Sequence, residues 1–269
     1  MCFNGFRVKI TLQPTDLEHI VLPIDYQYVL GSSLYHAIAH GNAKFAEWLH
    51  REGYGFDNKR FKMFTYSNLT AKKYIVKNDR LIIQEPPVTF QISVMNSEIA
   101  EHLVNGAFRK HLIELADRKS KVSFYISTVE ILPEVDFENE MVYKLITPCV
   151  ISYKSDRGTT YYSPADKEID YTTLFINNII NKYKIVFGWT YEDALFILQK
   201  FRNACSVEVL TPARSKLITI KANSQYETKV RGFLYTFKFK APVELHRIGY
   251  YAGFGEKNSM GFGWTEVVC

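Results

Sequence analysis

The sequence predicts an α+β protein built from two ferredoxin-like (RRM-like, βαββαβ) domains in tandem. The chain has 269 residues, and at about 150 residues per domain this length fits two domains. Hydrophobic residues make up 47% of the chain and charged residues 23%, which is typical of globular proteins and excludes a disordered chain or a coiled coil. In each half, the periodicity of apolar residues gives the order strand, helix, two strands, helix, strand.

The first half opens with a strand, since Val8, Ile10 and Leu12 alternate with polar residues. A helix is expected over 31–40 with Ser32 or Ser33 as its N-cap, and Gly41-Asn42 interrupts it. A second helix is expected from Ala43 to about Arg51, capped by Asn42 and ended by Gly53. Further strands are predicted over 61–66, 80–84, 88–94 and 122–132, with a helix over 98–109 between the last two. We predict an N-terminal domain over residues 1–133.

The second half repeats this plan with insertions, and we predict a C-terminal domain over residues 141–269 after an acidic linker. Its first helix is expected to have Ser163 as N-cap and Pro164 at the first helical position. Shorter helices are predicted over 192–200 and 242–249. Strands are predicted over 142–147, 150–153, 159–162, 206–210, 216–221, 229–240 and 262–268.

The basic residues are concentrated near the C-terminus. Between Lys200 and Lys257 there are eleven lysines and arginines against four acidic residues, an excess of seven, which leaves the rest of the chain at −2 of the total +5. A localised excess of this kind suits a polyanion such as RNA, because each neutralised phosphate releases counterions. A solvated surface of alternating strands is the alternative, and charge alone does not decide between the two.

The sequence indicates no metal and no other cofactor. His36 and His40 have the spacing of paired zinc ligands on a helix, but alanine at position 37 replaces the glutamate of the H-E-x-x-H motif. The four cysteines are scattered and form no C-x-x-C pair, so we expect reduced thiols. There is neither a membrane-length apolar stretch nor a signal-peptide pattern at the start, so we expect a cytoplasmic protein.

The segment 231–239 partly matches the RNP1 strand of RNA-recognition motifs, with Arg231, a glycine and an aromatic residue at its start. Leu234 and Lys238 break the motif. We therefore expect the aromatic side chains at 233, 235, 237 and 239 to line a buried face, with Lys238 and Lys240 pointing outward. Arg231, Lys238 and Lys240 are candidate contacts for RNA phosphates.

The most specific feature is the segment 253–263, in which two Gly-Phe-Gly triplets flank a short polar loop. Glycines allow positive φ angles, so successive backbone N–H groups could form a nest around an anionic oxygen, with Lys257 adding charge. The spacing does not fit GxGxxG, so a dinucleotide is not expected. The candidate RNA-binding residues of this loop are Gly253, Gly255, Lys257, Asn258, Ser259, Gly261 and Gly263.

The whole chain resembles the CRISPR-associated endoribonucleases that cut the repeats of precursor crRNA. The resemblance rests on the loop 253–263, on Leu22-Pro23 through Tyr35-His36-Ala37-Ile38, and on the segment 64–67. It implies the doubled ferredoxin-like fold, metal-independent cleavage, and products with 2′,3′-cyclic phosphate and 5′-hydroxyl ends. It also implies CRISPR repeat RNA as the partner. Other CRISPR-associated subunits and a second copy of the chain are left open as further partners, and no membrane is expected.

The resemblance also implies a catalytic histidine after the first helix, a tyrosine within it and a downstream lysine. These map to His50, Tyr35 and Lys62, with Lys59 or Arg60 as alternatives to Lys62. On one straight helix Tyr35 and His50 would lie about 22 Å apart, so the helix must turn back at Gly41-Asn42. A non-catalytic subunit that only holds repeat RNA is the competing function. An unrelated ferredoxin-like enzyme or ligand-binding protein is the third, because a fold alone does not fix function.

Overall fold

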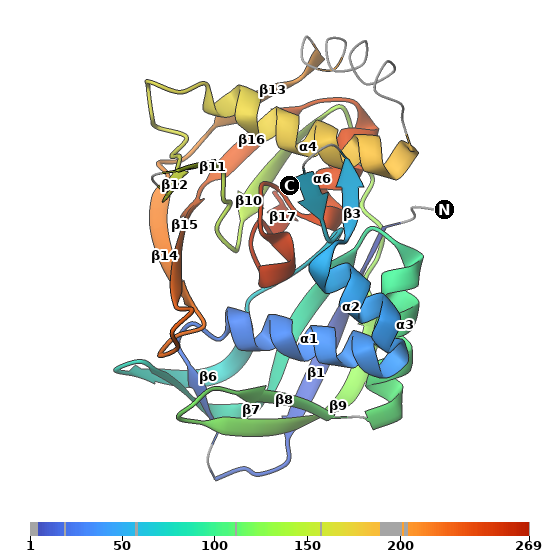
Figure 1. Ribbon diagram of the computed structural model, residues 1–269, viewed down its shortest axis with the longest axis vertical. Helices are drawn as coiled ribbons and strands as arrows, with labels where there is room; N and C mark the ends of the chain where they lie inside the picture. Colours follow the sequence, from blue (N-terminus) through green and yellow to red (C-terminus); the bar gives the residue numbers. More distant parts are fainter. Residues whose placement is uncertain are drawn as a thin grey trace.

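The chain folds as two βαββαβ units that pack against each other (Figure 1), so the predicted fold class is confirmed. The computed structural model describes residues 5–18, 20–56, 59–110, 112–156, 158–188, 201 and 204–268. The predicted helix over 192–200 lies outside these residues. No helix in the part of the chain so described is long and apolar enough to span a membrane.

In the first unit every strand pairs antiparallel with its neighbours. The sheet order is β2-β7-β1-β9-β8. Strands β5 and β6 pair with the edge of β7 opposite to the edge that pairs with β1 and β2. The elements are β1 (Phe6–Pro14), β2 (Val21–Pro23), α1 (Gln27–Gly41), α2 (Ala43–Arg51), β3 (Tyr54–Phe56), β4 (Lys59–Phe61), β5 (Phe64–Tyr66), β6 (Thr70–Lys77), β7 (Arg80–Val94), α3 (Ser97–Lys110), β8 (Leu112–Ala116) and β9 (Lys121–Ile131). Helices α1 and α3 contact each other at Gly41 and Gly106, where an added Cβ would overlap the backbone of the facing helix.

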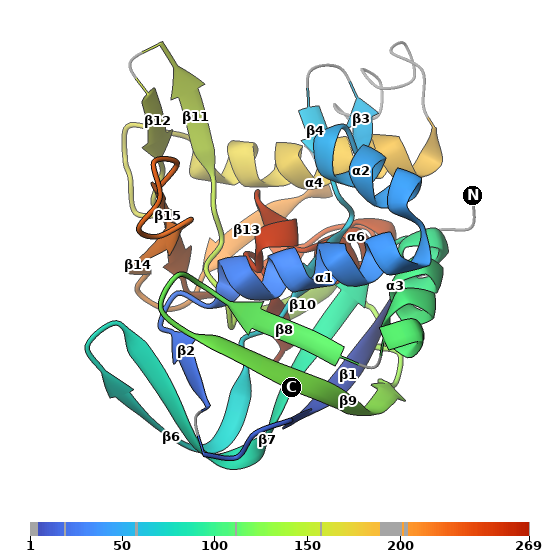
Figure 2. The same cartoon turned by 60° about the horizontal axis from the view of Figure 1, so that its bottom comes forward.

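In the second unit a four-stranded sheet of order β13-β16-β10-β17 carries α4 and α6 on one face. Two hairpins, β11–β12 and β14–β15, lie beside it (Figure 2). The elements are β10 (Glu140–Leu145), β11 (Ser152–Ser155), β12 (Gly158–Tyr161), α4 (Tyr171–Phe187), β13 (Ser206–Val209), β14 (Arg214–Ile220), β15 (Thr228–Leu234), β16 (Thr236–Lys240), α6 (Val243–Ala252), the 3₁₀ helix η1 (Asn258–Met260) and β17 (Thr265–Val267).

The aromatic face predicted for 233–239 is confirmed, since the four side chains are at most 8% exposed. The Phe237 ring lies 5.3 Å from the ring of Phe175 on α4, and the Phe239 ring lies 4.8 Å from the imidazole of His246 on α6. The segment is nevertheless two strands rather than one. The break falls at Tyr235, where β15 leaves its partner β14 and β16 joins β10 and β13.

Two predicted helix starts are wrong. Helix α1 begins at Gln27, so Ser32 and Ser33 lie inside it; the Ser33 hydroxyl donates to the carbonyl of Val29 one turn earlier. Helix α4 begins at Tyr171 rather than after Ser163, because the side chain of Asp170 accepts a hydrogen bond from the N–H of Thr173 and so forms the cap. In both cases another residue begins the helix, although the predicted caps are of the preferred types.

Three strand predictions also need correction. The Pro86-Pro87 pair does not divide the segment 80–94, which is one continuous strand, β7. The segment 61–66 is split between β4 and β5, and strands β3, β6 and β8 were not predicted at all. β6 is exposed along nearly its whole length, so its sequence lacks the alternation of a half-buried strand.

A buried arginine connects the two units. Arg7 on β1 donates to the carbonyl oxygens of Thr265 and Tyr250 at 2.7 and 2.8 Å. Its guanidinium carbon lies 3.3 Å and 3.8 Å from the ring centroids of Tyr250 and Trp264. Burial lowers the pKa of Arg7 to about 10, so the group stays charged at neutral pH. These contacts hold the C-terminal segment against the first sheet.

Candidate active site

The turn between α1 and α2 brings Tyr35 and His50 together. At Asn42 the backbone becomes extended, and its side chain accepts from the N–H of Phe45 to start α2. The expected break at Gly41-Asn42 and the Asn42 cap are therefore confirmed. The rings of Tyr35 and His50 lie 5.1 Å apart and nearly perpendicular, at 86°. Two side chains fifteen positions apart can thus face one phosphate group.

Tyr35 is half-buried between His50 and the C-terminal loop. Its ring lies 5.6 Å from that of Phe64 on β5, and the side chain of Ser259 lies beside its hydroxyl. Burial raises the pKa of Tyr35 to about 12. The hydroxyl therefore keeps its proton at neutral pH and can donate a hydrogen bond to an anion.

Lys62 joins this pair from the segment that follows β4. Its Nζ donates to the carbonyl oxygen of His50 at 2.8 Å. Gly53, at φ +65°, allows the approach, because a Cβ there would lie 2.9 Å from the same Nζ. Burial, and secondarily the charge of Arg60, lower the pKa of Lys62 to about 8. The structure therefore places a cation against the backbone of His50.

The glycine-rich loop is folded on itself, and several of the N–H groups that we expected to form an open nest are used within the protein. Gly253, Gly255, Gly261 and Gly263 all have positive φ angles. The N–H groups at 254, 256, 260, 261 and 263 donate to protein carbonyl oxygens, so these five are not available to an anion. The Asn258 side chain is also used internally, since its Nδ2 donates to the carbonyls of Phe254 and Phe262. The loop instead presents the side chains of Lys257 and Ser259, which line a cleft.

Lys182 on α4 lies beneath this loop and was not predicted from the sequence. Its Nζ donates to the carbonyls of Gly253 and Gly255 at 2.6 and 2.7 Å and to Oδ1 of Asn258 at 2.8 Å. Burial lowers its pKa to about 7. A signal was present, because Phe175, Ile179, Lys182 and Val186 recur at helical spacing and are all buried. A lysine on an apolar stripe needs buried acceptors.

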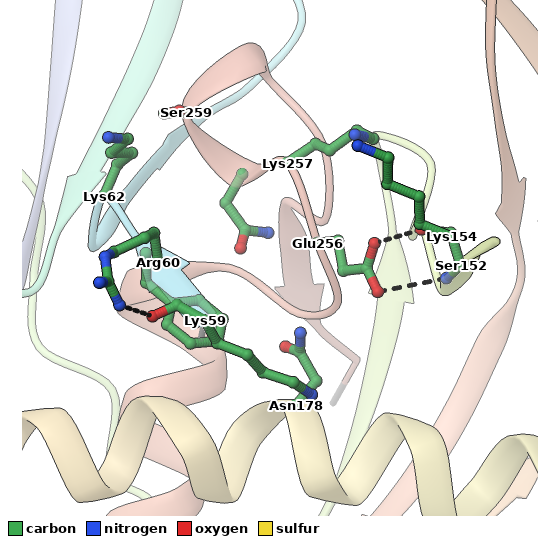
Figure 3. A pocket seen from close by; sticks show the side chains of 11 residues that line it. Lys59, Arg60, Lys62, Ser152, Lys154, Asn178, Glu256, Lys257 and Ser259 are labelled. Carbon is green, nitrogen blue, oxygen red and sulfur yellow. Dashed lines mark hydrogen bonds between the residues drawn. The ribbon is translucent and has the colours of Figure 1, made fainter. Parts of the chain in front are cut away.

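A cleft of about 500 Å³ lies between the glycine-rich loop, α4 and β4 (Figure 3). Ser259 lines it and also lies beside the Tyr35 hydroxyl, so the cleft borders the Tyr35–His50 pair. Among the described charged side chains that line it, only Glu256 is acidic, and that carboxylate accepts from the N–H and hydroxyl of Ser152. The lining residues are Lys59, Arg60, Phe61, Lys62, Ser152, Lys154, Asn178, Glu256, Lys257, Asn258 and Ser259. This excess of cations suits a phosphate backbone.

The other predicted RNA contacts lie elsewhere. Lys238 and Lys240 are on the face of the second sheet opposite α4 and α6, and Lys238 forms ion pairs with Glu140 and Glu208 at 3.5 and 3.7 Å. Arg231 is exposed on the β14–β15 hairpin. The structure therefore does not bring these three to the cleft. Lys59 and Arg60, the alternatives to Lys62, line the cleft from β4, and the Arg60 guanidinium donates to the Lys59 carbonyl.

Comparison with known proteins identifies the family of the chain. The family described as CRISPR-associated protein Cas6, N-terminal, matches residues 21–130, and that described as CRISPR-associated protein Cas6, C-terminal, matches residues 132–267. The CRISPR-associated endoribonuclease Cas6 of Pyrococcus furiosus is 29% identical over 97% of this chain and 89% of its own length. CRISPR-associated endoribonuclease Cas6 1 of Methanocaldococcus jannaschii is 28% identical over 98% of this chain and 94% of its own.

Two solved structures have the same fold. One is the product of a Cas6-related gene from Pyrococcus furiosus, with a TM-score of 0.77 and 20% identity over 98% of this chain and 99% of that one. The other is described as an RAMP protein binding different RNA substrates, also with a TM-score of 0.77 and 20% identity, over 98% of this chain and 100% of that one. At this level of identity the likeness concerns the fold.

Proposed function

The chain belongs to the Cas6 family of CRISPR-associated proteins, and we propose that it is an endoribonuclease that binds the repeats of precursor crRNA and cuts them into guide RNAs. The observation that carries the proposal is the meeting of three groups from separate segments. The Tyr35 and His50 rings lie 5.1 Å apart, and Lys62 bonds to the His50 carbonyl at 2.8 Å. The cationic cleft beside them provides a path for the RNA backbone.

The proposed reaction uses the nucleophile that RNA itself carries. The 2′-oxygen attacks the adjacent phosphorus, the bond from phosphorus to the 5′-oxygen breaks, and a 2′,3′-cyclic phosphate and a 5′-hydroxyl result. One proton leaves the 2′-hydroxyl and one must reach the departing 5′-oxygen. No oxidant, cofactor or external water is consumed, and we propose that the protein groups perform these steps without a metal.

His50 is the proposed proton donor to the departing 5′-oxygen. An imidazole exchanges protons readily at neutral pH. His50 stands in the last turn of α2, beside the Tyr35 ring and bonded through its carbonyl to Lys62, and we propose that it acts as acid rather than base. The proton of the 2′-hydroxyl then passes to solvent.

Tyr35 and Lys62 are the proposed stabilisers of the reacting phosphate. The neutral Tyr35 hydroxyl can donate to a phosphate oxygen or orient the 2′-hydroxyl, while Lys62 offsets the charge that builds up on phosphorus. Both lie against His50 before RNA arrives. Little reorganisation is then needed when the phosphate enters.

The proposal is tested by incubating the protein with CRISPR repeat RNA in excess EDTA. We expect one cut per repeat and retention of one fragment by the protein. Retention of intact RNA with no cutting would instead identify a non-catalytic subunit that holds the repeat. Failure to bind RNA at low salt would contradict both functions.

The lowered pKa of Lys62 predicts that activity falls at alkaline pH. Its pKa of about 8 lies below the ordinary lysine value, so the charge is present below pH 8 and is lost above it. We expect kcat/KM, which reports the free enzyme, to fall about tenfold per pH unit above 8. Lys62→Arg should remove this fall, because arginine keeps its charge, and Lys62→Met should lower kcat/KM about 100-fold at pH 7. A loss caused by Lys59→Met and not by Lys62→Met would transfer the role to Lys59.

A further inference from the structure

We propose that Lys182 is a positioning residue, which holds the glycine-rich loop in the conformation that brings the Ser259 hydroxyl to Tyr35 and the Lys257 side chain to the cleft. This inference rests on the proposed function, because it assigns a role in RNA cleavage to a residue that never touches the RNA. Lys182 is 1% exposed, so it acts only through the groups that surround it.

The loop offers Lys182 three converging acceptors. The carbonyls of Gly253 and Gly255 belong to the first Gly-Phe-Gly triplet, and Asn258 Oδ1 belongs to the polar segment between the triplets. A protonated lysine has three N–H groups and no acceptor, so it matches this arrangement. An apolar side chain of the same length would leave three buried oxygens without donors, and the loop would have to rearrange to find others.

Asn258 connects Lys182 to both ends of the loop through hydrogen bonds. Its Oδ1 accepts from Lys182, while its Nδ2 donates to the carbonyl of Phe254 in the first triplet and to that of Phe262 in the second. The next residue is Ser259, whose side chain lies beside the Tyr35 hydroxyl. A shift of Asn258 would therefore move the hydroxyl that contacts the candidate active site.

Lys182 also contacts the opposite side of the cleft. Its Nζ lies 5.6 Å from the ring centroid of Phe61, within range of a cation–π interaction. Phe61 lines the cleft and is the residue before Lys62. The Lys182 amine thus contacts both the loop that carries Ser259 and the strand that leads to Lys62. These two contacts set the distance between Ser259 and Lys62.

The test compares Lys182→Met with Lys184→Met, using full-length protein and repeat RNA at pH 6.5, below the pKa of about 7 of Lys182. Lys184 lies on the same helix, is 4% exposed and lines a different pocket, beside Trp48 and Gly53. With protein in excess over RNA, we expect Lys182→Met to lower the single-turnover cleavage rate about 10- to 100-fold, because small displacements of reacting groups have effects of this size. We expect Lys184→Met to stay within about threefold of the unmodified protein.

A double-mutant cycle separates positioning from general loss of structure. If Lys182 acts through Ser259, then Ser259→Ala should slow Lys182→Met much less than it slows the unmodified protein. If the rate losses of the two single variants simply multiply in the double variant, the inference is overturned. A folded Lys182→Met variant that cuts at the unmodified rate would also overturn it. If Lys182→Met does not fold, Asn258→Ala replaces it in the same cycle, and a rate within twofold of the unmodified protein would then overturn the inference. Failure of the unmodified protein to cut RNA would instead contradict the proposed function.

Discussion

Replacing His50 by alanine is expected to lower the cleavage rate about 10²- to 10⁴-fold, the usual contribution of a positioned acid or base. The imidazole would be the only group that supplies a proton to the departing 5′-oxygen in the proposed reaction. The affinity for repeat RNA should stay within about threefold, because the cations that line the cleft are untouched. Single-turnover cleavage and a binding titration of the same protein measure the two effects separately.

His36 provides the matched control for this substitution. Like His50 on α2, it is an exposed histidine, but it lies on α1 and lines a separate groove between α1 and β8, away from the cleft. His36→Ala should therefore cut RNA at the unmodified rate. Equal activity of the His50→Ala and unmodified proteins would contradict the assignment of His50.

A single 2′-deoxy nucleotide immediately upstream of the cut is expected to abolish cleavage at that site. This substitution removes the attacking oxygen and leaves the phosphate and the bases in place. Binding should persist, because the cationic cleft contacts phosphates and needs no 2′-hydroxyl at that position. Gel analysis of intact and cleaved RNA measures the loss.

The same substitution at a nucleotide remote from the cut is the control, and it should leave the rate unchanged. Continued cleavage at the modified site would show that the attacking oxygen comes from elsewhere, such as water. That result would contradict the proposed mechanism, although the protein would remain a ribonuclease.

The sequence predicted the site where local signals were strong. Gly41-Asn42 combines a glycine with a preferred N-cap residue, and this pair predicted the turn that brings together Tyr35 and His50, the two residues assigned from the family resemblance. The aromatic alternation at 233–239 likewise predicted a buried face correctly. In both places the local preference and the tertiary structure agree.

Predictions failed where long-range contacts decide the outcome. The glycines of the loop suggested an open nest, but the N–H groups of Glu256 and Gly263 donate to the carbonyls of Val150 and Pro148, which are distant in sequence. The role of Lys182 was not predicted for the same reason, because its acceptors lie more than seventy residues away along the chain. Ser163 has the residue type of an N-cap, but the helix starts at Tyr171, which is buried against the core.

In the proposed reaction the RNA supplies its own nucleophile, and His50, Tyr35 and Lys62 assist the attack. Mass spectrometry of the fragments formed in EDTA distinguishes this reaction from hydrolysis by water. We predict that the upstream fragment carries a 2′,3′-cyclic phosphate and that the downstream fragment begins with a 5′-hydroxyl. An upstream fragment that ends in a 3′-hydroxyl, with a 5′-phosphate on the downstream fragment, would contradict it.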